Sequence, residues 1–92
     1  MKIEWNENKR RINIQKHGID FQDLVSVFDK PILAKIDDRL DYQETRTIAL
    51  GELQDTVIVF VYAEKSREII RIISARKATK NESKIYHKKV YE

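Results

Sequence analysis

The residues best placed for chemistry are cations at the end of an isoleucine-rich run. Arg71 interrupts the run from Ile69 to Ile73, and the basic pair Arg76 and Lys77 follows shortly after it. An apolar run of this kind is typical of a strand in the interior of a small sheet. The cations would then be held on a rigid support, near the rim of the cleft that the sheet forms. Such groups favour a polyanion as the partner.

The composition indicates one globular domain spanning residues 1–92. Charged residues make up 36% of the chain and hydrophobic residues 41%, which excludes a disordered chain. No apolar run approaches the roughly 20 residues of a membrane helix, and the first residues lack the apolar region of a signal peptide. The chain has no cysteine and two histidines. We therefore expect a cytoplasmic protein with no metal site, cofactor or membrane segment.

The charge is unevenly distributed along the chain. Residues 69–92 carry seven Lys or Arg and two acidic residues, whereas residues 20–44 carry seven acidic residues and three cations. The basic C-terminal part favours a polyanionic partner. An equally simple interpretation is that these lysines only solvate a C-terminal helix.

The local patterns predict a first strand, two consecutive helices and a final helix. Asn6 can cap a first helix that runs to about Lys16, with Gly18 in the left-handed position after it. Its apolar stripe is narrow, essentially Ile12 and Ile14. A second helix begins at Asp20, ends before Pro31, and repeats apolar residues at helical spacing. That apolar face is Phe21, Leu24, Val25 and Phe28.

Four further strands and a closing helix complete the prediction. The strands are Ile32–Ile36, Arg46–Leu50 (closed by Gly51), Val57–Ala63 and the isoleucine-rich run, with 37–44, 52–55 and 64–68 as connections. The segment Thr79-Lys80-Asn81-Glu82 is a capping box, and the packing side of its helix would be Ile85, Tyr86 and Val90. The resulting order, β-α-α-β-β-β-β-α, defines an α+β fold in which two N-terminal helices cover one face of a mainly antiparallel sheet. The final helix can cover only part of the other face, so we expect a partner there.

Several short motifs resemble one known family. They are Trp5-Asn6-Glu7, Lys16-His17-Gly18, Arg46-Thr47-Ile48-Ala49-Leu50-Gly51, and the segment from Ile72 to Thr79. The chain resembles the BrnT toxins of bacterial type II toxin–antitoxin systems, whose fold belongs with the RelE-like ribonucleases. The resemblance implies RNA cleavage, neutralisation by a small BrnA-like antitoxin, and repression of the operon by the toxin–antitoxin complex, with operator DNA contacted mainly by the antitoxin.

The resemblance directs attention to seven residues. Metal-free RNA cleavage needs proton transfer, cations on the phosphate and a surface that fixes the nucleotide. We interpret Arg76 and Arg46 as phosphate-stabilising groups and His17 as the acid–base candidate, because histidine exchanges protons near neutral pH. The predicted RNA contacts are Lys16, Arg71, Lys77 and Tyr86. Lysine at position 77 replaces an arginine that the family often has, and so lacks the bidentate fork.

Each of these residues also has a structural interpretation. Arg46 can pair with Glu44, and Arg76 with the closing helix. His17 can stabilise the dipole at a helix end, and Tyr86 can be a core residue. Glu82 is explained by its capping box alone. At the level of function, the alternatives to a ribonuclease are a non-catalytic module that binds nucleic acid or an acidic partner, and a degraded toxin kept as a corepressor.

Overall fold

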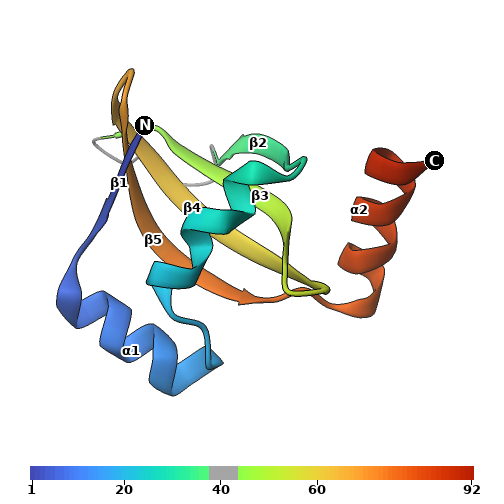
Figure 1. Cartoon of the computed structure of the whole chain (residues 1–92), viewed down its shortest axis with the longest axis horizontal. Coiled ribbons are helices and arrows are strands. Elements are labelled where there is room, and N and C mark those ends of the chain that lie inside the picture. The colour runs from blue at the N-terminus through green and yellow to red at the C-terminus, as the bar shows by residue number, and fades with distance from the viewer. Residues whose placement is uncertain (38–43) are drawn as a thin grey trace.

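The centre of the fold is a five-stranded sheet, seen in the computed structural model, which describes residues 1–37 and 44–92 (Figure 1). The strands are β1 (Lys2–Trp5), β2 (Leu33–Asp37), β3 (Arg46–Leu53), β4 (Thr56–Ser66) and β5 (Ile69–Lys77). Their spatial order is β1-β5-β4-β3-β2, with β1 parallel to β5 and the other pairs antiparallel. The isoleucine-rich strand is therefore interior, as predicted. Of the acidic connection predicted for 37–44, positions 38–43 lie outside the described residues.

The β3–β4 hairpin is tighter than the sequence suggested. Gly51 was expected to close the third strand, yet β3 continues to Leu53 and β4 begins at Thr56. The two residues between them, Gln54 and Asp55, both have positive φ (50° and 67°). This pair of conformations is typical of the type I′ turn, whose twist suits a two-residue hairpin.

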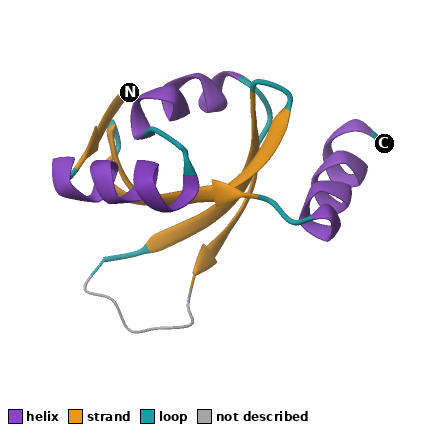
Figure 2. Ribbon diagram, turned by 90° about the horizontal axis from the view of Figure 1, so that it is seen from below, coloured by secondary structure: helices purple, strands orange, loops and turns teal. Residues whose placement is uncertain are grey.

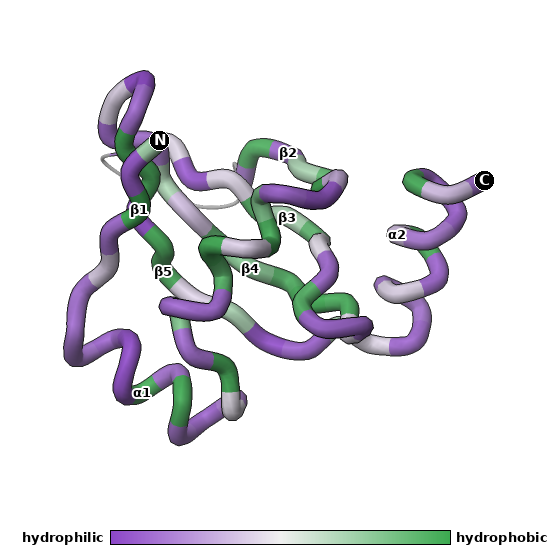
Figure 3. The backbone as a smooth tube through the Cα atoms, in the orientation of Figure 1, coloured by the Kyte–Doolittle hydropathy of each residue, from purple (hydrophilic) through white to green (hydrophobic). Residues whose placement is uncertain are grey.

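The second helical segment, η1 (Phe21–Asp29), is a 3₁₀ helix that packs on one face of the sheet. Phe21, Leu24 and Val27 are fully buried, whereas Val25 is 50% exposed. The prediction that Val25 faces the core was wrong because a 3₁₀ helix has three residues per turn, so its buried positions recur at every third residue. The hydrophobic centre of the sheet beneath it is visible along β4 (Figure 3).

Gly51 is the position that lets η1 approach β3 closely. A Cβ placed there would lie 2.6 Å from Cγ1 of Val27 and 3.2 Å from the ring of Phe60. Both neighbours belong to the buried core cluster. The glycine therefore leaves room for the helix rather than ending the strand.

Helix α1 (Glu7–His17) is held by a polar residue instead of an apolar stripe. Its predicted caps are confirmed, since Asn6 accepts a hydrogen bond from the Lys9 amide and Gly18 has φ 69°. The prediction that Ile12 and Ile14 pack this helix was wrong, because they are 54% and 37% exposed.

The buried residue of α1 is Asn13. Its side chain accepts a hydrogen bond from the Ala75 amide at 3.1 Å and donates one to the Ile19 carbonyl at 3.0 Å. Strand β1 pairs β5 only from Ile69 to Ile72, so beyond that point the edge of β5 needs another acceptor. Asn13 supplies it and fixes α1 alongside that edge.

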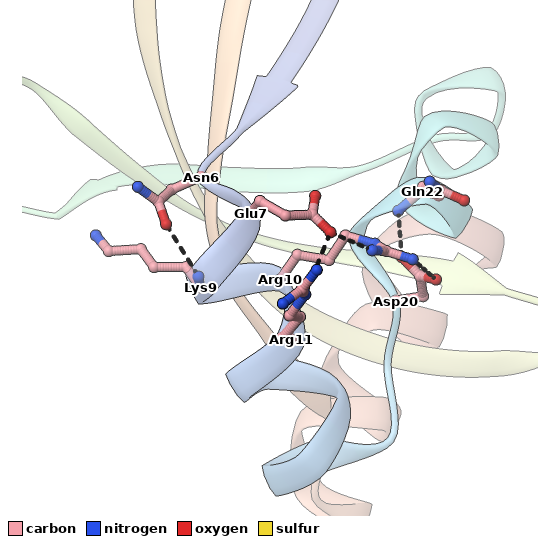
Figure 4. A network of polar contacts seen from close by, with 7 residues as sticks. All are labelled: Asn6, Glu7, Lys9, Arg10, Arg11, Asp20 and Gln22. Carbon is pink, nitrogen blue, oxygen red and sulfur yellow. Dashed lines mark hydrogen bonds and ion pairs between the residues drawn. The ribbon is translucent and has the colours of Figure 1, made fainter.

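A second polar contact ties α1 to the start of η1 (Figure 4). The Arg10 guanidinium donates to both carboxylate oxygens of Asp20, at 2.8 and 3.0 Å, and also to Glu7. Asp20 at the same time accepts from the Gln22 amide and so caps η1. The hydrogen bond between Arg10 and Asp20 lowers the pKa of the Asp20 carboxyl and raises the pKa of the Arg10 guanidinium. The turn between the two helical segments is thereby fixed.

Helix α2 (Lys80–Tyr91) stands at the end of the molecule remote from α1 (Figures 1 and 2). The predicted capping box is confirmed, with Thr79 and Glu82 each bonded to the other's amide. Tyr86 is fully buried and its hydroxyl donates to the Pro31 carbonyl at 2.6 Å. Ile85, predicted to pack, is 44% exposed. One buried ring therefore anchors this helix.

Among the described residues, no helix combines the length and apolar character needed to cross a membrane.

Candidate functional site

A cleft of about 430 Å³ lies on the sheet face opposite the η1 core. Two rows of paired residues cross the sheet beneath it, Lys35–Ile48–Val61–Ser74 and Leu33–Leu50–Val59–Arg76. The residues that line the cleft come from α1, four strands and α2. They are His17, Lys35, Ile48, Val59, Val61, Ser74, Ala75, Arg76 and Glu82. An apolar floor is thus surrounded by cations, a hydroxyl, an imidazole and one carboxylate.

Arg76 lies in this cleft, but its guanidinium already has a partner. It donates to both carboxylate oxygens of Glu82, at 2.8 and 2.9 Å, and to the Lys77 carbonyl at 3.2 Å. The sequence had assigned Glu82 only to the capping box. The hydrogen bond to Arg76 lowers the pKa of Glu82 to about 2, and the same bond raises the pKa of Arg76. The Arg76 side chain stays 44% exposed, so it is paired yet accessible to a ligand.

His17 reaches the same cleft from the end of α1. Its ring is exposed and lines the cleft together with Ser74 and Arg76. Its position follows from Asn13, which holds the preceding turn of α1 to Ala75, the residue before Arg76. The neighbouring Lys16 is exposed but does not line the cleft.

Arg46 and Arg71 lie on the same sheet face, beyond the cleft. A third row of paired residues crosses all five strands there, Asp37–Arg46–Ala63–Arg71–Glu4. Arg71 Nε is 3.6 Å from a Glu4 carboxylate oxygen, and Arg46 Nε is 3.9 Å from one of Glu44. Arg71 and Arg76 are five residues apart on β5, or roughly 16 Å at about 3.3 Å per residue. These arginines therefore suit separate phosphates of an extended strand.

Lys77 and Tyr86 do not join the other candidates. Lys77 pairs with Ile58, a core residue, and so points to the sheet face opposite Arg76. There it lines a separate pocket of about 170 Å³ near Gly18. Tyr86 is fully buried, which agrees with the core interpretation and not with a ring that stacks on RNA. Lys77 lies outside the site because successive side chains of a strand point to opposite faces of the sheet. Tyr86 lies outside it because its ring is buried.

The structure adds site residues that the sequence did not indicate. Lys35, Ser74 and Glu82 line the cleft, and Asn13 fixes the elements that carry His17 and Arg76. Lys35 had one signal, as the single cation in the predicted strand Ile32–Ile36. Ser74 and Asn13 had none, because their roles depend on strand register and on a contact 62 residues apart.

The described residues contain no group of three or more His, Cys, Asp or Glu side chains that could hold a metal ion. The polar groups that line the cleft are an imidazole, two cations, a hydroxyl and a carboxylate.

Comparison with known proteins identifies the class to which this chain belongs. A family described as "Ribonuclease toxin, BrnT, of type II toxin-antitoxin system" matches residues 5–82. The 1.1 Å crystal structure of the Brucella abortus ribonuclease toxin BrnT has a similar fold, with a TM-score of 0.67 and 35% sequence identity, over 87% of this chain and 99% of that one. None of the curated protein sequences matches the chain. The class is that of ribonuclease toxins from type II toxin–antitoxin systems. Within it, the chain belongs to the BrnT family, as its motifs suggested.

Proposed function

We propose that this protein is a metal-independent endoribonuclease that inhibits translation by cutting RNA in the cytoplasm. The observation that supports this most is the position of Arg76 in a cleft that also holds His17 and Lys35. Membership of a ribonuclease toxin family supplies the reaction type. The cleft supplies side chains that could carry out this reaction. Because the family and the cleft both favour RNA cleavage, we also assign the fold to the RelE-like ribonucleases.

The chemistry needs no group from outside the chain. The ribose 2′-oxygen attacks the adjacent phosphorus as its proton passes to a base, and the bond to the 5′-oxygen breaks as that oxygen gains a proton. Because the nucleophile belongs to the substrate, positioning provides much of the rate. We assign both proton transfers to His17, whose imidazole can accept the 2′-hydroxyl proton as a base and then donate it to the leaving 5′-oxygen as an acid. Arg76 stabilises the charge on the phosphate, as preorganised donors do in acyl and phosphoryl transfer.

Arg46 and Arg71, together with Lys35, bind the phosphates that flank the scissile one, and Lys16 extends this surface at the end of α1. For Arg76 to act, a phosphate oxygen has to replace Glu82 on the guanidinium. The Arg76–Glu82 pair is partly exposed, with side-chain exposures of 44% and 29%. Exposed single pairs contribute about 0–1 kcal/mol and a bidentate pair such as this one contributes more, so the phosphate has to form equivalent bonds with Arg76 to offset the loss.

The same face supports the proposal of a protein partner. Type II systems pair a toxin with an antitoxin, and the family implies such a partner. An apolar groove of about 350 Å³, lined in part by Leu33, Leu50 and Ile85, adjoins the cleft. We propose that a BrnA-like antitoxin covers this face and neutralises the toxin in a hetero-oligomer. The complex would then repress its own operon through the antitoxin's contacts with operator DNA.

One observation favours a second function, that of a non-catalytic corepressor. Glu82 already neutralises Arg76, as would be expected in a toxin that has lost its activity. Expression in bacteria distinguishes the two proposals. The ribonuclease proposal predicts growth arrest by the native chain and no arrest by Arg76→Ala, which should still bind the antitoxin with its affinity largely intact. Growth arrest by a folded Arg76→Ala variant would contradict the site, and no arrest by either would favour the corepressor.

A further inference from the structure

Helix α2 presents a face on which cations and aromatic rings alternate. Five exposed residues fall within about 100° of the helix circumference, because each residue advances the helix by about 100°. They are Lys80, Lys84, His87, Lys88 and Tyr91. We call this set the α2 outer face. Its two rings lie against the ring of Tyr86, which anchors the helix, with centroids 5.6 Å (His87) and 6.2 Å (Tyr91) from it.

The two rings of the α2 outer face are held in place. His87 and Tyr91 stack with centroids 6.0 Å apart and an interplanar angle of 29°. Nδ1 of His87 is 2.9 Å from the Ser83 carbonyl oxygen, to which it donates, and the Tyr91 hydroxyl donates to Glu52. That bond raises the pKa of Tyr91 to about 12, so the hydroxyl keeps its proton at neutral pH. Tyr91 nevertheless remains 57% exposed.

The first turn of α2 borders the cleft. Glu82, in that turn, lines the cleft and holds Arg76. Lys80 begins the helix two residues earlier. At about 100° per residue, Lys80 and Glu82 lie about 160° apart around the helix, so an RNA strand bound at Arg76 has to pass over the first turn of α2 to reach the α2 outer face, which it can then follow for roughly 18 Å at about 1.5 Å per residue.

We propose that the α2 outer face binds the single-stranded RNA that extends beyond the cleft. Lys80, Lys84 and Lys88 contact its phosphates, and a base stacks on the exposed Tyr91–His87 pair. Cations interleaved with aromatic rings are the usual means of binding a single strand without sequence preference. A single strand fits better than a duplex, whose bases are not free to stack on side chains. This inference rests on the proposed function, since it extends the same substrate site.

The phosphate contacts are tested by salt dependence with the full-length chain. The probe is a labelled single-stranded oligouridine of about twelve nucleotides, made with 2′-O-methyl groups so that it cannot be cut. Fluorescence anisotropy would compare Lys84→Gln/Lys88→Gln with Lys9→Gln/Lys89→Gln. The second pair removes the same charge from α1 and from the other side of α2.

We expect the Lys84/Lys88 variant to bind about tenfold more weakly at low salt, with a slope of log Kd against log salt shallower by about 1.4. The control should keep the native slope. Equal slopes in the two variants would overturn the proposal.

The stacking contact has its own pair of variants. Tyr91→Ala should weaken binding about tenfold, whereas Tyr91→Phe, which keeps the ring and loses only the bond to Glu52, should bind as the native chain does. Equal losses for both would overturn the stacking role. A comparable Tyr91→Ala loss with a DNA duplex of the same length would overturn the assignment to single strands.

A 2′-O-methyl trinucleotide separates this inference from the proposed function. We expect this short probe to occupy the cleft without contacting the α2 outer face. Its binding should therefore be weaker in Arg76→Ala and unchanged in the α2 variants. Loss of trinucleotide binding in the α2 variants would overturn the inference. Absence of cleavage with cuttable RNA would count against the proposed function, while the binding differences on α2 would still stand.

Discussion

The Arg76–Glu82 pair gives a prediction about how RNA gains access to the cleft. In Glu82→Gln the side chain keeps its shape, and glutamine can also serve in a capping box. The variant loses the charge that competes with a phosphate for Arg76 and one of the two oxygens that accept from the guanidinium. A single exposed ion pair contributes about 1 kcal/mol and a bidentate pair contributes more, and 1.4 kcal/mol corresponds to about tenfold in affinity. We therefore expect Glu82→Gln to bind RNA about fivefold to tenfold more tightly than the native chain.

The assay is anisotropy with the uncuttable trinucleotide, and Glu92→Gln is the control. Glu92 is an exposed acid directly after the same helix, so the control changes the net charge equally without touching Arg76. Its affinity should stay near that of the native chain. If Glu82→Gln binds more weakly than the control, the competition between carboxylate and phosphate is refuted. If its binding rises but cleavage falls more than about a hundredfold, Glu82 itself acts in proton transfer.

Three further predictions concern stability. Asn13→Ala should lower the free energy of unfolding by about 2–3 kcal/mol in urea denaturation, because the Ala75 amide loses its acceptor; an unchanged midpoint would contradict this. Gly51→Ala should lower the thermal midpoint through a clash with Val27, at a cost of about 1–3 kcal/mol, and a midpoint equal to the native one would show that η1 can move aside. The pKa of Glu82 is about 2 in the fold against an ordinary 4.5, so its stabilising effect is present above about pH 4.5 and is lost as pH falls toward 2. The free energy of unfolding of Glu82→Gln should therefore fall less over that interval than that of the native chain. An identical dependence of stability on pH in the two proteins would contradict this.

The parts of the fold that sequence could predict are those set by neighbouring residues. The caps at Asn6, Gly18 and Thr79 follow from local chemistry, and the interior strand follows from its isoleucines. The predictions of buried side chains were wrong where burial depends on the type of helix or on a contact between residues far apart in the sequence. Val25 is exposed because η1 is a 3₁₀ helix, and Ile12 is exposed because a buried amide holds α1.

The sequence indicated which arginines to consider for the candidate site, but not how they are arranged on the sheet. Which residues share a sheet face depends on register, which turns and bulges set. The structure brings Arg46, Arg71 and Arg76 to one face and sends Lys77 to the other. The structural interpretation that Arg76 pairs with the closing helix is confirmed, with Glu82 as the partner across the junction between β5 and α2; which residue of that helix is the partner was not predicted.

The most direct test of the central claim is RNA cleavage by the purified chain in EDTA, comparing Arg76→Ala with Arg11→Ala. Arg11 is a guanidinium on α1 whose side chain is 74% exposed, so the control removes the same charge outside the cleft. We predict cleavage by the native chain and by Arg11→Ala, and a rate about 10²–10³-fold lower for Arg76→Ala. Equal rates for the two variants, or cleavage that requires an added metal ion, would contradict the account.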